Sequence, residues 1–189
     1  APVTILFWSK LGDYNNSGIY KPGVLSKGYY SKTQWSVRFV GPESDPDVVS
    51  NGEAYVEFSL ANYSPQEVAQ RIVASTSVGI GEWHHVAVQR HTGGMRVYID
   101  GILDKETTQT PVDCNPNGPL TVGTYDTWWP APGMQMHGQL DALMIYSREL
   151  SAAEIQARMY TEIVPSEESG LEAYWDFNDA SGAQAKDAS

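Results

Sequence analysis

Two adjacent histidines, His84 and His85, begin an alternating apolar run in the segment GEWHHVAVQRHTGGMRVYIDG. Imidazole pairs serve as metal ligands or general bases, so this pair is the first candidate for chemistry. The alternation, however, predicts a strand, and neighbouring side chains of a strand point to opposite faces. The two rings therefore cannot serve one ligand. His84 and His91 can each reach a face, but the sequence arranges no carboxylate or nucleophile beside them.

Two adjacent tryptophans, Trp128 and Trp129, lie in the Pro- and Gly-rich segment GTYDTWWPAPGMQMHGQ. Flat aromatic rings stack on the apolar faces of sugar rings. Asp126 and Gln135 are near enough in sequence to hydrogen-bond sugar hydroxyls, with Tyr125 alongside. These five residues are the predicted ligand site. In the structural alternative, one tryptophan closes the open end of a β-sandwich and the prolines stiffen the loop.

The composition indicates a globular domain with an acidic surface. The 189 residues are 41% hydrophobic and 19% charged, and the formal net charge is -11. Such a charge repels nucleic acids and anionic membranes, so nucleic acid is excluded as a partner. The single cysteine, Cys114, rules out an intrachain disulfide. No apolar run approaches the roughly 20 residues of a membrane span, so we expect no membrane insertion.

Short alternating runs separated by Gly, Pro, Asn and Asp recur along the chain, a pattern typical of a β-sandwich. A hairpin turn is predicted at Gly93 and Gly94, and a second tight turn at Asp100 and Gly101. The predicted strands cover residues 3–10, 34–40, 54–60, 84–90, 95–101, 119–123 and 139–147.

One segment has the pattern of a helix instead. Ser151 and Glu154 form a capping box at its start, and Leu150 and Ile155 are spaced as a hydrophobic staple. We therefore expect one short helix over residues 150–160, packed on the sandwich. A further helical turn is predicted over residues 64–72, where Ser64 can cap and Pro65 can occupy the first helical position.

Several segments together resemble the laminin G-like and pentraxin group of concanavalin A-like jelly rolls. The segments are TILFWSK, VLSKGYYSKTQWSVRF, GEWHHVAVQRHTGGMRVYIDG, GQLDALMIYSRELSAAEIQARMY and GLEAYWDFNDASGAQAKDAS. The strand with Gly-x-Trp-His-His-Val-Ala, followed by one that ends in Tyr-Ile-Asp-Gly, is the most specific. The resemblance implies an all-β fold, a two-sheet antiparallel jelly-roll sandwich, with ligands on the concave face or its rim loops. It also implies that Trp83 and His85 are packed framework.

A structural calcium ion is a further implication, because related jelly rolls bind one with the aspartate that matches Asp141. Asp176, Asp179 and Asp187 can add oxygens if the C-terminal tail folds back, since Ca²⁺ takes about six to eight oxygen ligands. Turn formation is the alternative role of these aspartates. A pentraxin-type double calcium site is not expected, because the corresponding loop has one acidic residue, Asp126.

The sequence disfavours catalysis. Glycoside hydrolysis needs two carboxylates a few ångströms apart. The resembling hydrolases supply them from a Glu-x-Asp-x-x-Glu strand, which this chain lacks, and the motifs of jelly-roll polysaccharide lyases are also absent. Glu53 and Glu57 flank the letters AYV and are interpreted as the solvated side of an edge strand.

The sequence thus predicts a non-catalytic, extracellular recognition module, secreted or on a cell surface, which binds an oligo- or polysaccharide as part of a larger protein. The alternatives are an adhesion or protein-interaction module of the same fold and, third, a polysaccharide-degrading jelly-roll enzyme. The jelly-roll domain is expected over residues 1–163. Residues 164–189 either close the same sandwich or begin a neighbouring module.

Overall fold

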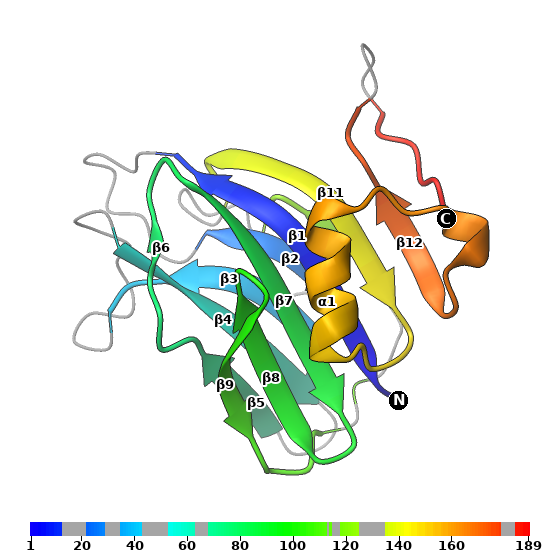
Figure 1. The fold of residues 1–189 in the computed structure, drawn as a ribbon. Coiled ribbons are helices and arrows are strands. Elements are labelled where there is room, and N and C mark those ends of the chain that lie inside the picture. Colours follow the sequence, from blue (N-terminus) through cyan, green and yellow to red (C-terminus); the bar gives the residue numbers. More distant parts are fainter. Residues whose placement is uncertain are drawn as a thin grey trace.

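Two antiparallel β-sheets packed face to face form the body of the protein (Figure 1). The structure is a computed structural model. It describes residues 1–12, 22–28, 35–42, 53–62, 68–112, 114, 118–124, 135–178 and 184–189.

The first sheet, sheet A, has the strand order β12-β11-β1-β7-β8-β9. All its neighbouring strands are antiparallel, as in a sandwich built from hairpins and longer connections. Its strands are β1 (Val3–Leu11), β7 (Trp83–His91), β8 (Gly94–Ile99), β9 (Ile102–Thr107), β11 (Gly138–Tyr146) and β12 (Leu171–Trp175).

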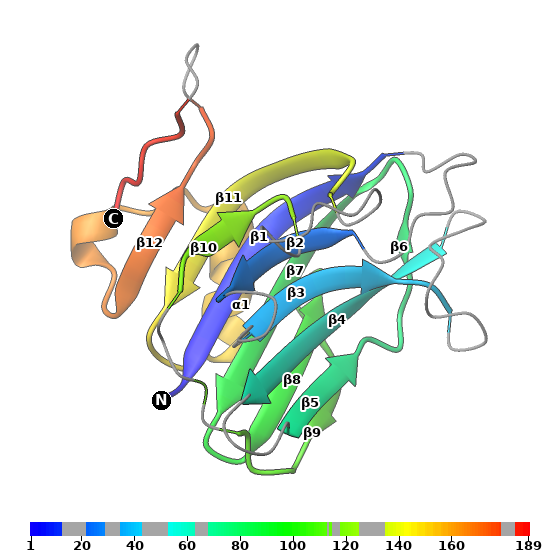
Figure 2. The same ribbon diagram turned by 180° about the vertical axis from the view of Figure 1, so that it is seen from behind.

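The second sheet, sheet B, has the order β10-β2-β3-β4-β5, with β6 paired to β4 beside this path (Figure 2). Its strands are β2 (Gly23–Lys27), β3 (Trp35–Val40), β4 (Glu53–Asn62), β5 (Val68–Val73), β6 (Val78–Gly79) and β10 (Leu120–Val122). The jelly-roll sandwich with one α-helix is therefore confirmed, and each of the seven predicted runs is a strand.

The helical turn predicted over residues 64–72 is wrong where the structure describes it. Residues 68–73 form β5, which pairs with β4 from Glu57↔Val73 to Asn62↔Val68. The capping signal of Ser64 and Pro65 is local, whereas pairing with β4 satisfies the backbone groups of a whole strand.

Tight turns join β7, β8 and β9 as the sequence predicts. His91 pairs with Gly94, which leaves a two-residue loop between β7 and β8. Between β8 and β9, Asp100 has φ 50° and Gly101 has φ 75°. Two successive positive φ values characterise the type I′ turn, which matches the twist of a hairpin and favours Asp-Gly.

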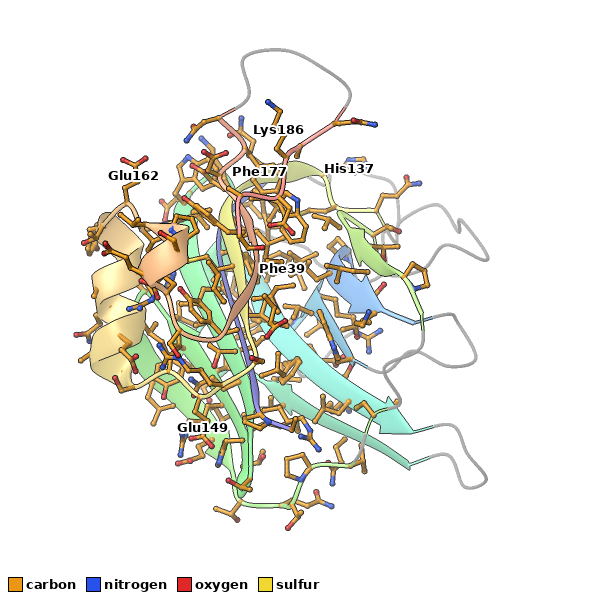
Figure 3. The ribbon with its side chains drawn as sticks, turned by 90° about the vertical axis from the view of Figure 1, so that its right-hand side faces the viewer. Phe39, His137, Glu149, Glu162, Phe177 and Lys186 are labelled. Atoms are coloured by element: carbon orange, nitrogen blue, oxygen red, sulfur yellow. The ribbon has the colours of Figure 1, made fainter. Side chains whose placement is uncertain are left out.

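The main core lies between the sheets and follows from strand alternation. Val86 and Val88 of β7 face Phe39 and Phe58 of sheet B, and all four side chains are fully buried. Figure 3 views the sheets from the side, with Phe39 between them. Burying a Val or Phe side chain stabilises the fold by about 1.5–3 kcal/mol, so these alternating positions hold the sandwich together.

A second core lies on the outer face of sheet A, beneath α1 (Ala152–Tyr160) (Figure 1). Leu150 and Ile155 of the predicted staple are buried there with Ala87 of β7. The capping box is confirmed: Glu154 N donates to Ser151 Oγ (3.2 Å), and Ser151 N donates to Glu154 Oε2 (2.7 Å). The pKa of Glu154 is lowered to about 2, mainly because its carboxylate accepts the hydrogen bond from the backbone N–H of Ser151.

Replacing Ser151 by alanine should lower the free energy of unfolding by about 1 kcal/mol, because the hydroxyl is the acceptor for the Glu154 amide. In a domain of this size the melting temperature should fall by about 2 to 4 °C. Thermal unfolding followed by circular dichroism measures the change. Ser151→Thr is the matched control because it keeps the acceptor, and an equal loss for both variants would contradict the cap.

The C-terminal segment adds the edge strand of sheet A. β12 pairs antiparallel with β11 through Met144↔Tyr174 and Ile145↔Ala173. Beyond it, Ala188 N donates to Tyr174 O (2.8 Å), so the last residues run back along β12.

Candidate functional site

His84 and His85 point to opposite faces of sheet A, as predicted. In the register of β1 and β7, His85 pairs with Trp8 and His84 with Ser9. His85 is 2% exposed on the outer face, where its ring makes an edge contact with Trp8 at a centroid distance of 5.4 Å. Burial lowers the pKa of His85 to about 4, although Asp100 acts in the opposite direction. The ring is therefore neutral at pH 7.

His84 belongs to the turn structure rather than to a metal or catalytic pair. Its Nδ1 lies 3.0 Å from Asp100 Oδ2, and its Nε2 accepts a hydrogen bond from Gly79 N (3.2 Å). The other carboxylate oxygen of Asp100, Oδ1, accepts from His85 N (2.9 Å). One aspartate thus ties the β8–β9 turn to the start of β7.

The prediction that Trp83 is packed framework is wrong. Its side chain is 42% exposed, whereas His85 is buried. Trp83 is the first residue of β7 and pairs with Lys10 near the end of β1. Beneath α1, by contrast, Trp8 donates from Nε1 to Met159 O (3.3 Å), so the ring that packs on His85 is Trp8.

The aspartates predicted for calcium are engaged locally where the structure describes them. Asp141 Oδ1 accepts from Ala142 N (2.8 Å), and Asp176 Oδ1 accepts from Asn178 N (3.1 Å). Asp187 Oδ1 accepts from Tyr174 N and Ser189 N, each at 3.0 Å. Burial acts to raise the pKa of Asp187, but these backbone donors lower it overall.

Within the described ranges, no three His, Cys, Asp or Glu side chains form a group that could hold a metal ion. Asp179 lies outside the described residues. The calcium ion and its ligands stay a prediction.

The edge strand β5 of sheet B lies beside the edge strand β9 of sheet A (Figure 2). Described residues of both sheets line a recess at this edge. We call this recess, with a volume of about 570 Å³, the sheet B pocket. Its lining includes Tyr55 and Glu57 of β4, Arg71 and Val73 of β5, and Lys105 and Thr107 of β9.

A buried carboxylate held by two arginines is the central feature of this pocket. Glu57 is 1% exposed, and its Oε1 accepts from Arg38 Nε at 2.6 Å. Its second oxygen, Oε2, lies 3.6 Å from Arg71 Nη1, on a side chain that is 64% exposed. The interpretation of Glu57 as the solvated side of an edge strand is therefore wrong, because β4 lies between β3 and β5. Glu53, at the start of β4, is exposed as expected.

This arrangement offers fixed acceptors and donors beside an aromatic ring. Tyr55 is half-buried next to Glu57 on the same face of β4. Paired acid and base carboxylates need a second acid within roughly 10 Å. Among the described lining residues, Glu57 is the one carboxylate.

Four of the five residues predicted to bind ligand, Tyr125, Asp126, Trp128 and Trp129, lie outside the described residues. The fifth, Gln135, is exposed and pairs with Thr124, which closes the base of their loop.

Gln135 also pairs with Gly23, the first residue of β2. Gly23 pairs with Arg38, Arg38 with Glu57, and Glu57 with Val73. These residues form one row across sheet B, here the Glu57 row. Neighbouring strands are about 4.8 Å apart, so the loop base lies about 15 Å from Glu57 along this row.

Sequence reasoning gave Glu57 a different role and did not consider Tyr55 and Arg71 as lining residues of a pocket. A signal was present, because Tyr55 and Glu57 alternate with the buried Ala54, Val56 and Phe58 and must share the face turned away from the core. The partner residues on β3 and β5 depend on strand register, which the sequence does not give.

The fold and this recess define the class: a jelly-roll β-sandwich with a pocket at the edge where its two sheets meet. Residues 1–156 match the concanavalin A-like lectin/glucanases superfamily, and the chain belongs to this family. A comparison with curated proteins gives no match. No helix among the described residues is long and apolar enough to cross a membrane.

Similar solved structures share the fold at low sequence identity. A protein of Bacteroides ovatus ATCC 8483, provisionally named as carbohydrate-binding, is 15% identical with a TM-score of 0.72 over 99% of this chain. This chain spans 49% of that protein. The heptameric SAP-like pentraxin of Limulus polyphemus is 15% identical with a TM-score of 0.60, over 82% of this chain and 68% of the pentraxin.

A third similar structure is domain 4 of an extracellular arabinanase from Geobacillus stearothermophilus, in complex with arabinotriose. It is 18% identical with a TM-score of 0.52, over 82% of this chain and 65% of that one.

Proposed function

We propose that this domain is a non-catalytic carbohydrate-binding module whose saccharide lies on sheet B, from the sheet B pocket toward the loop that Thr124 and Gln135 close. The observation that carries the proposal is Glu57, a buried carboxylate that is fixed by Arg38 and lines a recess beside Tyr55. Fixed polar groups beside a ring match the hydroxyls and the apolar face of a sugar.

The similar structures support this function, since one is provisionally named as carbohydrate-binding and another is an arabinanase domain in complex with arabinotriose. The Glu57 row adds a geometric reason. It connects the pocket to the base of the loop that carries Trp128 and Trp129, over about 15 Å, a span suited to a short oligosaccharide. Trp128, Trp129, Tyr125, Asp126 and Gln135 remain our proposed contacts at the loop end.

The same reasoning favours binding over hydrolysis. In the described lining Glu57 is the one carboxylate, and both its oxygens face arginines. A general acid must carry a proton that it can donate to the leaving group, and a carboxylate engaged by a guanidinium is poorly suited to that role.

We further propose that the domain works in a secreted or cell-surface protein. This follows from the family resemblance alone.

Replacing Tyr55 by alanine should weaken binding of the preferred glycan about tenfold, the equivalent of roughly 1.4 kcal/mol, because the pocket loses its ring. A broad glycan array identifies that glycan, and titration calorimetry measures the dissociation constants. Trp83→Ala is the matched control, since Trp83 is an exposed aromatic residue on sheet A. Its affinity should equal that of the unaltered protein.

The same titration tests the loop. Trp128→Ala and Trp129→Ala should each weaken binding by about ten- to hundredfold with an unchanged melting temperature. If both variants melt several degrees lower, the tryptophans are structural. If the unaltered domain binds no glycan on the array, the proposed function is wrong and the adhesion alternative replaces it.

A further inference from the structure

We infer that the sheet B pocket selects a saccharide that carries a carboxylate or sulfate group, which Arg71 and Lys105 bind. The inference rests on the proposed function and names its ligand class. It begins from a contrast in charge. The chain has 23 acidic and 12 basic residues. The described lining of the pocket has two cationic side chains, Arg71 and Lys105, and one anionic side chain, Glu57.

Glu57 does not cancel this local charge, because Arg38 already faces it. Arg38 approaches Glu57 Oε1 through both Nε (2.6 Å) and Nη2 (2.5 Å), and its own side chain is 15% exposed. Arg71 is farther away, 3.6 Å from Oε2, and is 64% exposed. A guanidinium has several N–H donors, so one long contact leaves most of them for a ligand.

Lys105 provides the second cation from the opposite sheet. It pairs with Val97, a core residue, so its stem starts on the inner face of β9 and its exposed end lines the pocket. The carboxylate of its neighbour Asp104 is bound to the backbone instead: Oδ1 accepts from Thr76 N at 3.0 Å and Oδ2 from Ser75 N at 2.5 Å. No ion pair engages Lys105 within the described ranges.

A lysine on β9 also has a purely structural explanation, since charges on an edge strand prevent pairing with another sheet. That explanation requires only that Lys105 is exposed. It applies equally to Arg71, on the edge strand of the other sheet, but it does not require that the two cations line one recess, as they do here. Two cations around one recess match the delocalised negative charge of a carboxylate or sulfate group.

The acidic surface strengthens the argument. At physiological ionic strength charges farther than about 8 Å are largely screened, so the local cations decide whether an anion binds. The remaining negative charge of the protein repels anions elsewhere, so binding depends on a pocket with the opposite sign.

The test compares saccharides that differ only in the acidic group. Three pairs suit it: oligogalacturonate and its methyl ester, sialyllactose and its methyl ester, and a sulfated galactan oligosaccharide and its desulfated form. Titration calorimetry of the whole domain at about 0.05 and 0.5 M salt measures each affinity. In at least one pair the acidic member should bind at least about tenfold more tightly at low salt, and the preference should shrink at high salt.

Arg71→Gln and Lys105→Gln should each reduce this preference about three- to tenfold, while affinity for the neutral member changes little. Lys10→Gln removes the same charge from β1, at a residue that does not line the pocket, and should leave the preference intact. The pair that shows the preference also tells a carboxylate from a sulfate ligand.

Three results would overturn the inference. Equal affinity for acidic and neutral members refutes it and leaves the proposed function standing. A preference that survives both pocket variants places the anion elsewhere and refutes it too. Failure of these ligands and of every glycan on a broad array refutes the proposed function, and the inference with it.

Discussion

Replacing Glu57 by alanine is expected to lower the free energy of unfolding by about 3 kcal/mol, because the change leaves the Arg38 guanidinium without its closest carboxylate. Removing one partner of a buried ion pair is costly, since the other charge stays desolvated. In a domain of this size the loss corresponds to a melting temperature roughly 6 to 12 °C lower. Denaturant unfolding at pH 7 measures the change.

Glu53→Ala is the matched control, because Glu53 lies on the same strand but is exposed. Its effect should stay within about 0.5 kcal/mol. Arg71→Met should also cost less than about 1 kcal/mol, since that side chain is 64% exposed. If Glu57→Ala and Glu53→Ala behave alike, Glu57 is solvated and the pocket lacks its fixed acceptor.

The double variant Arg38→Met, Glu57→Leu tests separately what the ion pair contributes to stability and what it contributes to binding. Apolar residues in place of both charges remove the desolvation cost along with the attraction, so the double variant should be more stable than Glu57→Ala alone. It should nevertheless bind the glycan poorly, because the fixed acceptor of the pocket is gone. Stability and binding would then respond differently to the same two positions, as expected of a binding site built on a structural ion pair.

The sequence was sufficient for the elements in which local pattern and tertiary contact agree. In β7, Val86 and Val88 alternate with His85 and Ala87, and both sets are buried, one between the sheets and one beneath α1. The capping box of Ser151 and Glu154 is likewise local, because both partners lie within one helical turn. Such features need no knowledge of distant residues.

Besides the two-residue β6, three strands were not predicted, each for a different reason. β2 has five residues and a register shift against β3, too short for a clear alternation. β9 is mostly exposed, so it lacks a buried apolar face. In β5 the local capping signal favoured a helix, and pairing with β4 prevailed.

The pocket could not be predicted because its residues meet only through register. Arg38, Glu57 and Arg71 come from three strands, and their contacts depend on how β3, β4 and β5 align. The sequence places Glu57 on the face turned away from the core, but it does not indicate that β4 lies inside the sheet. An outward-facing carboxylate on an inner strand can be covered by long side chains from both neighbouring strands.

Trp83 is a residue for which the family resemblance gave a wrong prediction of burial. The resemblance implied a packed tryptophan beside His85, yet the ring against His85 is Trp8 of the neighbouring strand. A motif fixes which residues belong to a strand, whereas burial at the end of that strand depends on what lies above it. α1 ends near Trp8, where Tyr160 approaches it at a ring distance of 6.3 Å, and Tyr160 is itself 82% exposed.

Acidification from pH 7 to pH 4 should reduce stability by about 3 kcal/mol through His85 alone. Its pKa is about 4 in the folded protein and about 6.5 in the unfolded chain, so the unfolded state binds the proton more tightly. The contribution of His85 to the free energy of unfolding is fully present above pH 6.5 and is lost as the pH falls toward 4. Denaturant unfolding at half-unit steps between pH 7.5 and 4 measures this slope.

Carboxylates also lose their native interactions on acidification, so the test depends on the difference between two curves. His85→Phe keeps a ring against Trp8 and removes the titrating group, so its stability should fall less steeply between pH 6.5 and 4 than that of the unaltered protein. Its lower dependence on pH should hold even if the variant is less stable at pH 7. His137→Gln replaces an exposed histidine and is the control for loss of an imidazole at the surface. Parallel curves for His85→Phe and the unaltered protein would mean that His85 takes up its proton equally in both states, and the buried, neutral ring beneath α1 would then be the wrong description.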